Sequence, residues 1–406
     1  MPAQTPTSAP LAPSASATAA APTTVRSPRL GWFAVVSLTL GLFSIVTTEI
    51  LPIGLLTPIG DTFGASDGTA GLMMTLPGIL AAVAAPVVTV GTGRVDRRRM
   101  LCLLMAVLAL ANFLAACAPA YWLMMVSRVL VGCVIGAFWS IGVGLAERLV
   151  PAERVGRATA LIFSAVPLGS VLGVPAGTLL AQLAGWRAVF VTMGVLTLGV
   201  LAALLVSLPP LAPQQVTRLA VLRDLLGTAR ARAGLAVTFL IVTAHFATYT
   251  YVTPFLADVT HAGPGLITAF LLAYGTAGIV GNFLAGAWVR RALRTTFALA
   301  AVLVAAATLL LPLLGTSRPG ALALLLVWGL AYGAVPVCSQ TWFATAAPHA
   351  PEAASVLFTS SFQATLSFGA LAGGAVVDAA SVSVVMVAGG AAAVLAATAA
   401  VCRPRG

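Results

Sequence analysis

Long apolar stretches separated by short polar ones repeat along almost the whole chain. Each stretch has about 18–25 residues, the length that an α-helix needs to cross a lipid bilayer. The pattern predicts twelve membrane-spanning helices. Their expected ranges are 32–57, 69–91, 100–117, 122–145, 157–181, 188–208, 233–257, 264–288, 297–314, 320–345, 354–377 and 382–401.

The remaining residues divide the chain into four parts. Residues 1–29 are mostly Ala, Pro, Ser and Thr, a composition that cannot form a buried core and that predicts a disordered tail. Residues 209–232 are rich in Pro at their start and in Arg at their end, and we expect them to be a linker. This linker separates two sets of six predicted helices, 30–208 and 233–402.

Glycine pairs recur at corresponding places in the two halves. Gly132 and Gly136 correspond to Gly329 and Gly333, and Gly169 and Gly173 correspond to Gly369 and Gly373. Two repeated halves of six helices are typical of many secondary transporters, which bind their substrate between the halves. The pattern therefore predicts an all-α membrane protein with twelve transmembrane helices.

The charged residues support this topology and exclude a soluble protein. Of the 406 residues 60% are hydrophobic and 8% are charged, whereas soluble domains have about 25% charged residues. All 21 basic residues are Arg, and the net charge is +11. Eighteen of them lie in alternate loops and near the termini, whereas the opposite loops hold Arg187 and Arg318. Because cytoplasmic loops collect basic residues, we expect both termini and the linker in the cytoplasm. A nucleic-acid-binding protein would instead gather its charge on a soluble face.

Two opposite charges lie deep inside predicted helices. Among the ten acids Glu49 alone is well inside a helix, and among the basic residues Arg128 alone is. Counted from the outer ends of their helices, the two lie at similar depth. A charge at the bilayer centre costs roughly 2.5–3.5 kcal/mol on insertion scales, and such residues usually face a cavity or one another. We expect Glu49 and Arg128 to pair, directly or through water, either as a proton site that Arg128 tunes or as a structural ion pair.

Several motifs resemble those of the major facilitator superfamily. The pattern Arg128-x-x-x-Gly132-x-x-x-Gly136 is similar to the fourth-helix motif of that family. Gly169-x-x-x-Gly173-Val174-Pro175-x-Gly177 resembles the fifth-helix motif of its drug:proton antiporter branch. The segment from Gly91 to Arg99 resembles the loop motif between the second and third helices, but Gly93 stands where an Asp is usual. The conformational residues that these motifs imply are Gly91, Arg94, Asp96, Arg97, Arg98, Gly132, Gly136, Gly169, Gly173, Pro175 and Gly177.

Three further stretches resemble one subgroup of that superfamily. They are Gly136 to Ser140, Arg148 to Pro151, and Gly185 to Arg187 with Phe190. The subgroup contains purine-ribonucleoside efflux pumps, arabinose and other sugar efflux permeases, and chloramphenicol-resistance proteins. The resemblance implies a multi-pass protein of the bacterial inner membrane that works as a monomer, with protons and a small-molecule substrate as its partners.

Polar and aromatic residues inside helices are the candidates for substrate binding. His245 and Tyr249 are four residues apart and so share one helix face. The other candidates lie in helices that line the cavity of the resembling fold: Trp139, Tyr274, Asn282, Trp328, Tyr332, Gln340 and Gln363. Together they suit a neutral ligand that contains rings, because they offer stacking surfaces and amide groups but few charges.

These observations predict a proton-coupled antiporter that exports a small organic molecule, such as a nucleoside, a sugar or a drug-like compound. An importer or uniporter of a sugar-like solute on the same fold is the first alternative, and a membrane sensor or membrane-embedded enzyme is the second. We expect no enzyme activity, metal or cofactor, because no metal-ligand cluster or nucleophile triad is present and a chain without Lys lacks a phosphate-binding GK[ST] motif.

Overall fold

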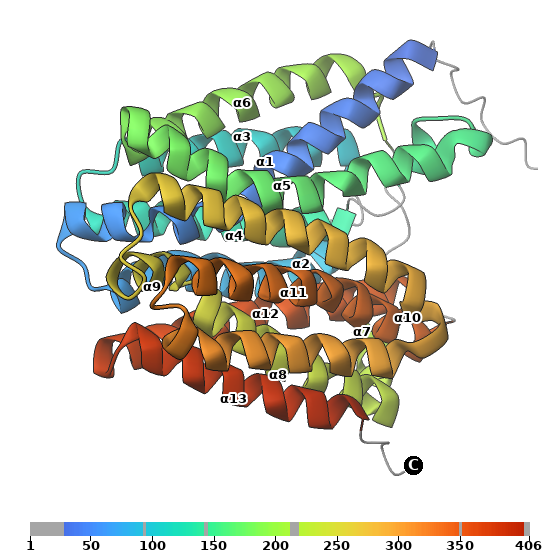
Figure 1. Cartoon of the computed structure of the whole chain (residues 1–406). Helices are drawn as coiled ribbons and strands as arrows, with labels where there is room; N and C mark the ends of the chain where they lie inside the picture. The colour runs from blue at the N-terminus through green and yellow to red at the C-terminus, as the bar shows by residue number, and fades with distance from the viewer. Residues whose placement is uncertain (1–27, 92–94, 142–144, 212–218, 349–350, 402–406) are drawn as a thin grey trace, which may run out of the picture.

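The structure is an all-helical bundle whose long helices run side by side (Figure 1). The computed structural model describes residues 28–91, 95–141, 145–211, 219–348 and 351–401. The first group of helices consists of α1 (Pro28–Phe63), α2 (Asp67–Gly91), α3 (Arg97–Ala116), α4 (Tyr121–Ile141), α5 (Val155–Ala184) and α6 (Trp186–Ser207). Two short 3-10 turns, η1 (Leu145–Arg148) and η2 (Ala152–Arg154), precede α5.

The second group follows the predicted linker, in which α7 (Leu219–Gly227) lies. It consists of α8 (Ala229–Tyr249), α9 (Val252–Asp258), α10 (Pro264–Leu314), α11 (Arg318–Ala346), α12 (Pro351–Ala379) and α13 (Val382–Val401). Together α8 and α9 cover the predicted helix 233–257. The predicted helices 264–288 and 297–314 are the two arms of α10, which bends at Ala292, where φ is −145° and ψ is 56°. Both predicted helices are therefore confirmed, but they extend toward each other and leave only the kink at Ala292 between them.

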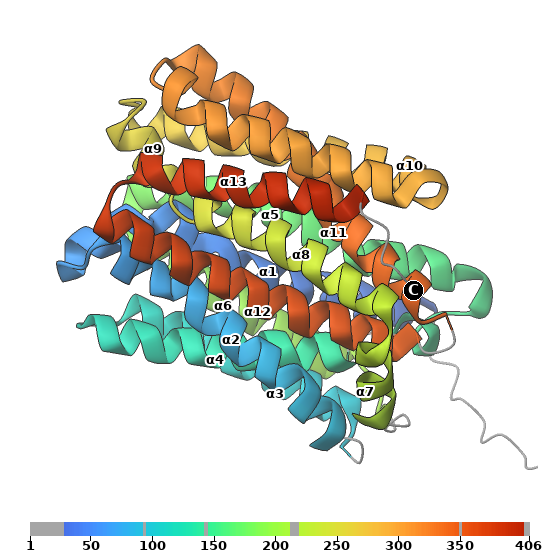
Figure 2. The same cartoon turned by 90° about the horizontal axis from the view of Figure 1, so that it is seen from below.

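Within the described ranges, eleven helical stretches are long and apolar enough to cross a membrane. They account for every predicted span except 354–377, which is α12. That helix has the required length, but its mean hydropathy is lowered by hydroxyl and amide side chains at Thr359, Ser360, Ser361, Gln363, Thr365 and Ser367. Because α12 packs between α2 and α8 (Figure 2), these polar groups meet protein on two sides. The structure thus agrees with a twelve-helix membrane fold.

The two ends of the bundle differ in charge. Helix α1 begins and α13 ends on the same side of the bundle (Figure 1), where Arg97, Arg98 and Arg99 at the start of α3 also lie. We call this side the Arg-rich end. The opposite side, where α1 ends and α2 begins, carries Arg187 and Arg318 and is called the Arg-poor end. The predicted tail falls almost wholly outside the described residues, since α1 begins at Pro28.

Glycines allow the closest helix crossings, and they do so in the same way in both groups. In the first group, a side chain at Gly132 or Gly136 of α4 would overlap backbone of α2, and one at Gly169 or Gly173 of α5 would press on Val46 and Thr47 of α1. Small residues four apart let two helix backbones approach in this way.

The second group repeats these crossings at the glycines that the sequence analysis paired with them. Gly329 and Gly333 of α11 lie against the backbone of α10 at Tyr274 and Gly278. Gly369 and Gly373 of α12 lie against the backbone of α8 at Thr243 and Ala247. The pairs α4/α2 and α11/α10 therefore correspond, as do α5/α1 and α12/α8. The two groups meet chiefly where α12 packs on α2 and where α10 packs on α5.

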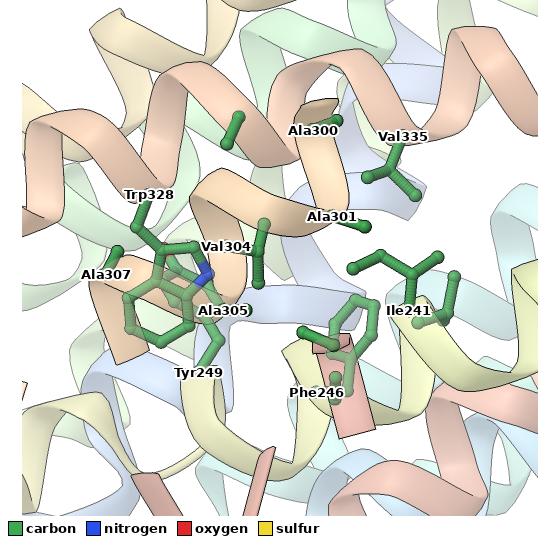
Figure 3. Close-up of a cluster of buried hydrophobic side chains, with 14 of the residues drawn as sticks. Ile241, Phe246, Tyr249, Ala300, Ala301, Val304, Ala305, Ala307, Trp328 and Val335 are labelled. Carbon is green, nitrogen blue, oxygen red and sulfur yellow. The ribbon is translucent and has the colours of Figure 1, made fainter. Parts of the chain in front are cut away.

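The core of the second group combines large rings with small side chains. Trp328 of α11 is fully buried, and Figure 3 shows it with Tyr249 beside Val304 and Ala305 of the second arm of α10. Alanines on that arm leave room for the indole ring, which explains how α10 can pack closely on both α11 and α13. This packing holds Tyr249 and its neighbours at the boundary with the first group.

We predict that replacing Gly333 by Leu destabilises the bundle. The new side chain would collide with the carbonyl group of Gly278, and overpacking of this kind typically costs about 1–3 kcal/mol. Thermal unfolding of the purified protein in detergent should show a lower melting temperature.

The matched control is Gly286→Leu on the first arm of α10. Gly286 is exposed and has open space where a side chain would extend, and Leu has a higher helix propensity than Gly. Its melting temperature should equal or exceed that of the wild type. Equal losses in the two variants would contradict the packing role of Gly333.

Candidate functional site

Glu49 joins the two helix groups near the middle of the bundle. Its side chain, on α1, is 7% exposed, and its Oε1 atom accepts a hydrogen bond of 2.9 Å from Nε2 of Gln363 on α12. Helix α1 contains Pro52 and Pro58, yet it runs unbroken past Glu49 because Pro residues inside transmembrane helices are tolerated when neighbours satisfy the freed backbone groups. The deepest predicted acid is therefore held by an amide from the other group.

Arg128 lies at the level of Glu49 but does not bind its carboxylate. The guanidinium group is fully buried, and its Nη1 donates to the main-chain oxygen of Thr48 at 3.0 Å. Its Nη2 donates to Oγ of Ser127 at 3.2 Å, and its Cζ lies 5.2 Å from the ring centroid of Phe190. Across the described residues no ion pair joins Glu49 to Arg128. The two residues are at similar depth as expected but form no direct ion pair, and the expected pairing through water stays a prediction.

The reason lies in the geometry of α1. Successive residues of an α-helix are rotated by about 100°, so the backbone at Thr48 and the side chain of Glu49 face different neighbours. The carbonyl group of Thr48 faces α4, whereas the carboxylate of Glu49 faces α12. The hydroxyl group of Thr48 also contacts the amide of Asn112 on α3, at 3.3 Å.

A cavity of about 170 Å³ lies between the two groups, and Ile50, the residue after Glu49, is part of its wall. On the side of the first group its wall consists of Ile50 and Ile53 of α1 and of Val166, Pro167, Ser170 and Val171 of α5. On the side of the second group the candidate residues in the wall are His245, Tyr249, Tyr274, Asn282 and Tyr332. The sequence analysis thus found the aromatic wall from α8, α10 and α11.

The rings in this wall form one stacked cluster. His245 stacks on Tyr332, with ring centroids 3.2 Å apart, and on Tyr249 at 5.0 Å. Tyr249 in turn stacks on Tyr274 at 4.6 Å. Nδ1 of His245 accepts a hydrogen bond of 3.1 Å from Nε1 of Trp328, which fixes the imidazole ring from behind. The hydroxyl group of Tyr332 is buried and has no hydrogen-bond partner among the described residues.

Four of the predicted substrate-binding residues do not line this cavity. Trp328 lies behind the cluster as the partner of His245, and Gln363 is bound to Glu49. Trp139 packs against the core of the first group, and Gln340 is exposed on α11. The sequence analysis missed the wall supplied by α1 and α5, whose residues are mostly apolar. Its one signal there is Ser170, a polar residue within the α5 span.

The helix groups are joined at the Arg-poor end. The carboxylate of Asp378, at the end of α12, accepts hydrogen bonds from Oγ of Ser66 at 2.8 Å and from the backbone nitrogen of Gly68 at 3.0 Å, at the start of α2. The hydroxyl groups of Thr178 on α5 and Thr268 on α10 are 2.8 Å apart. A further bond between the groups lies between this end and Glu49, where the hydroxyl group of Thr253 on α9 donates to the carbonyl group of Ile53 on α1 at 2.9 Å.

The motif between α2 and α3 binds the start of the linker. Asp96 caps α3 by accepting from the backbone nitrogen of Arg99 at 3.1 Å, and its other oxygen accepts from that of Leu211 at 2.8 Å. The backbone nitrogen of Arg97 donates to the carbonyl group of Leu211, and Arg98 donates to that of Leu205. Gly91 is the last residue of α2, and Arg94 lies outside the described residues.

The remaining motif residues lie on α5, where it crosses α1. Pro175 is inside α5, and a side chain at Gly177 would overlap Leu51. Gly169, Gly173 and Gly177 leave the face of α5 that meets α1 without side chains, so the two helices pack closely there. Helix α1 also carries Glu49. The contact is a packing surface, and the cavity lies beside it.

Comparison with known proteins identifies the family. The family model of the Major Facilitator Superfamily matches residues 36–364. The transcription regulatory protein OpdE of Pseudomonas aeruginosa is 32% identical over 352 residues, which cover 86% of this chain and 87% of that protein. The purine ribonucleoside efflux pump NepI of Escherichia coli K12 is 30% identical over 350 residues, covering 86% of this chain and 88% of the pump.

Solved structures share the fold at low sequence identity. The human organic anion transporter MFSD10 (TETRAN) superposes with a TM-score of 0.66 at 18% identity, over 92% of this chain and all of that one. A bacterial homologue of the human lysosomal transporter Spinster, in an inward-facing and unoccupied conformation, superposes with a TM-score of 0.67 at 16% identity, over 93% of this chain and 96% of that one. The family match over most of the sequence, together with the helix arrangement, establishes that the chain belongs to the major facilitator superfamily of membrane transport proteins.

Proposed function

We propose that the protein is a proton-coupled antiporter that exports a small, uncharged, ring-containing molecule by alternating access. The observation that carries this proposal is the bond between Glu49 and Gln363. It connects the two helix groups through a buried carboxylate, and the same turn of α1 supplies Ile50 and Ile53 to the cavity wall. Protonation and substrate binding would therefore act on the same contact between the groups.

The chemistry of the pair suits a proton switch. An ionised carboxylate only accepts hydrogen bonds, whereas a protonated carboxyl group also donates one. Gln363 can meet either form, since its amide has a donor and an acceptor, and its Oε1 has no partner among the described residues. Gain or loss of a proton on Glu49 thus changes which amide atom it binds and, with it, the link between α1 and α12.

The cavity supports an uncharged ligand with rings. Tyr332, Tyr249 and His245 offer aromatic faces, while Asn282 offers a polar contact. None of the described residues in the wall carries a full charge apart from a His that can be neutral. The relative NepI is a purine ribonucleoside efflux pump, which supports a nucleoside as the substrate. A test panel of a nucleoside, a pentose and a phenicol covers the compounds that the sequence analysis considered.

The direction and location complete the proposal. With the Arg-rich end in the cytoplasm, the joined Arg-poor end would face outward, and the hydrogen bonds there support a state closed to the outside. A monomer in the bacterial inner membrane would then release substrate outward as protons enter. In right-side-out vesicles, net uptake of a panel compound along the proton gradient would instead indicate import.

We predict that Glu49→Gln abolishes efflux driven by a pH gradient but retains substrate exchange. The amide keeps the size of the side chain and a hydrogen bond to Gln363, but it cannot take up a proton. The measurement uses proteoliposomes and labelled inosine, arabinose and chloramphenicol, with and without a gradient. Asp61→Asn, an exposed acid on the same helix, is the control and should transport normally. Gradient-driven efflux at the wild-type rate in Glu49→Gln would exclude Glu49 as the proton site.

We predict that Tyr332→Leu weakens binding of the panel compound that the wild type binds most tightly by roughly tenfold, because stacking of a ring on an aromatic side chain is worth about 1–3 kcal/mol. Isothermal titration of purified protein measures the change. Phe283→Leu removes an aromatic ring that is 74% exposed on α10 and should leave affinity unchanged. Equal affinities in Tyr332→Leu and the wild type would remove the aromatic cluster from the substrate site.

We predict that a disulfide between Thr178→Cys and Thr268→Cys stops transport. The two hydroxyl groups are 2.8 Å apart across the groups, so the bond would hold the Arg-poor end closed. Transport by the oxidised double variant should fall to background and return after reduction. Each single variant, treated in the same way, controls for the native cysteines. Full transport in the crosslinked form would contradict alternating access at this end.

A further inference from the structure

Pro52 removes a backbone hydrogen bond from α1 next to Glu49. In an α-helix the N–H group of residue 52 would bond to the carbonyl group of residue 48, but proline has no N–H group. Pro52 lies inside α1, and the freed carbonyl group is that of Thr48. An unsatisfied carbonyl group in a membrane interior costs several kcal/mol, so a neighbour must supply a donor.

Arg128 supplies this donor. Its Nη1 lies 3.0 Å from the oxygen of Thr48, and the guanidinium group is fully buried. The other contacts of the guanidinium group are the hydroxyl group of Ser127 and the ring of Phe190, so in the described part of the chain no carboxylate pairs with it. A cation inside a bilayer is costly, and here carbonyl, hydroxyl and aromatic groups stabilise it.

We propose that Arg128 is a positioning residue that replaces the hydrogen bond removed by Pro52 and thereby holds Glu49 at the angle at which it meets Gln363. The restraint acts through one residue of backbone, because Thr48 directly precedes Glu49. Asn112 holds the side chain of Thr48 from α3 at 3.3 Å, which leaves this turn of α1 fixed on two sides. Arg128 therefore acts on Glu49 as a hydrogen-bond donor to the backbone, and its charge is secondary.

This assignment differs from that of a counter-ion in one measurable way. If Arg128 acts as a donor to the carbonyl group of Thr48, an N–H group at position 52 makes it partly redundant, and Pro52→Ala provides that group. If Arg128 acts by its charge on Glu49, Pro52→Ala leaves the need for Arg128 unchanged. The two substitutions together therefore separate the two roles.

The experiment follows the carboxyl group itself and needs no substrate. Dicyclohexylcarbodiimide reacts with protonated carboxyl groups in apolar surroundings, and peptide mass spectrometry locates the adduct on Glu49. The labelling rate is measured against pH for the wild type, Arg128→Met, Pro52→Ala and the double variant, with Glu49→Gln as the blank. Arg187→Met is the matched control, because Arg187 also donates to a backbone carbonyl group, that of Ala118, and lies over an aromatic ring.

We expect Arg128→Met to move the pH profile and to change the labelling rate at a fixed pH by about threefold to fifteenfold, the range for single hydrogen bonds between transmembrane helices. Pro52→Ala alone and Arg187→Met should keep the wild-type profile. The pH profile of the double variant should lie close to that of the wild type. An unchanged profile in Arg128→Met, or a double variant that keeps the full shift, would overturn the proposal.

Yield of folded protein gives a second readout should Arg128→Met fail to fold. The proposal then expects the double variant to elute as a monodisperse protein in detergent, because the backbone N–H group that Pro52→Ala introduces restores the missing bond. Aggregation of both Arg128→Met and the double variant, with Pro52→Ala folded, would overturn it.

Discussion

A carboxylate placed in the middle of an apolar bundle constrains everything around it. Glu49 needs a hydrogen-bond donor, and the donor comes from the other helix group, through Gln363. Helix α12 packs on α2, and its Gln363 reaches α1 from there. One buried hydrogen bond thus links the two groups at the centre of the bundle.

The two sides of the aromatic cavity differ in the side chains that they supply. Rings from three helices of the second group stack on one another, and the bond from Trp328 to His245 orients the imidazole ring. Alanines on the second arm of α10 make room for the indole ring behind the cluster. On the opposite side of the cavity, α1 and α5 present mostly apolar side chains. Aromatic rings are therefore supplied by one side of the cavity and mostly aliphatic side chains by the other.

The helices could be predicted from the sequence because span length and Arg distribution are strong local signals. The glycine pairs also predicted the helix crossings, since a residue without a side chain lets two helix backbones approach closely. The partners of Glu49 and Arg128 could not be predicted in this way. A depth count places two charges at one level, but it does not say which way each side chain faces. That direction depends on the crossing of α1 with α4 and α12, and on the carbonyl group that Pro52 frees.

The polarity of α12 bears on how the protein is made. The first half of α12 carries hydroxyl and amide side chains, so that half gains less from contact with lipid alone than a uniformly apolar stretch does. Its amide and hydroxyl groups become tolerable once α1, α2 and α8 are in place to meet them. Insertion of α12 should therefore depend on helices synthesised hundreds of residues earlier. Substitutions at Glu49 would then affect biogenesis as well as the finished transporter.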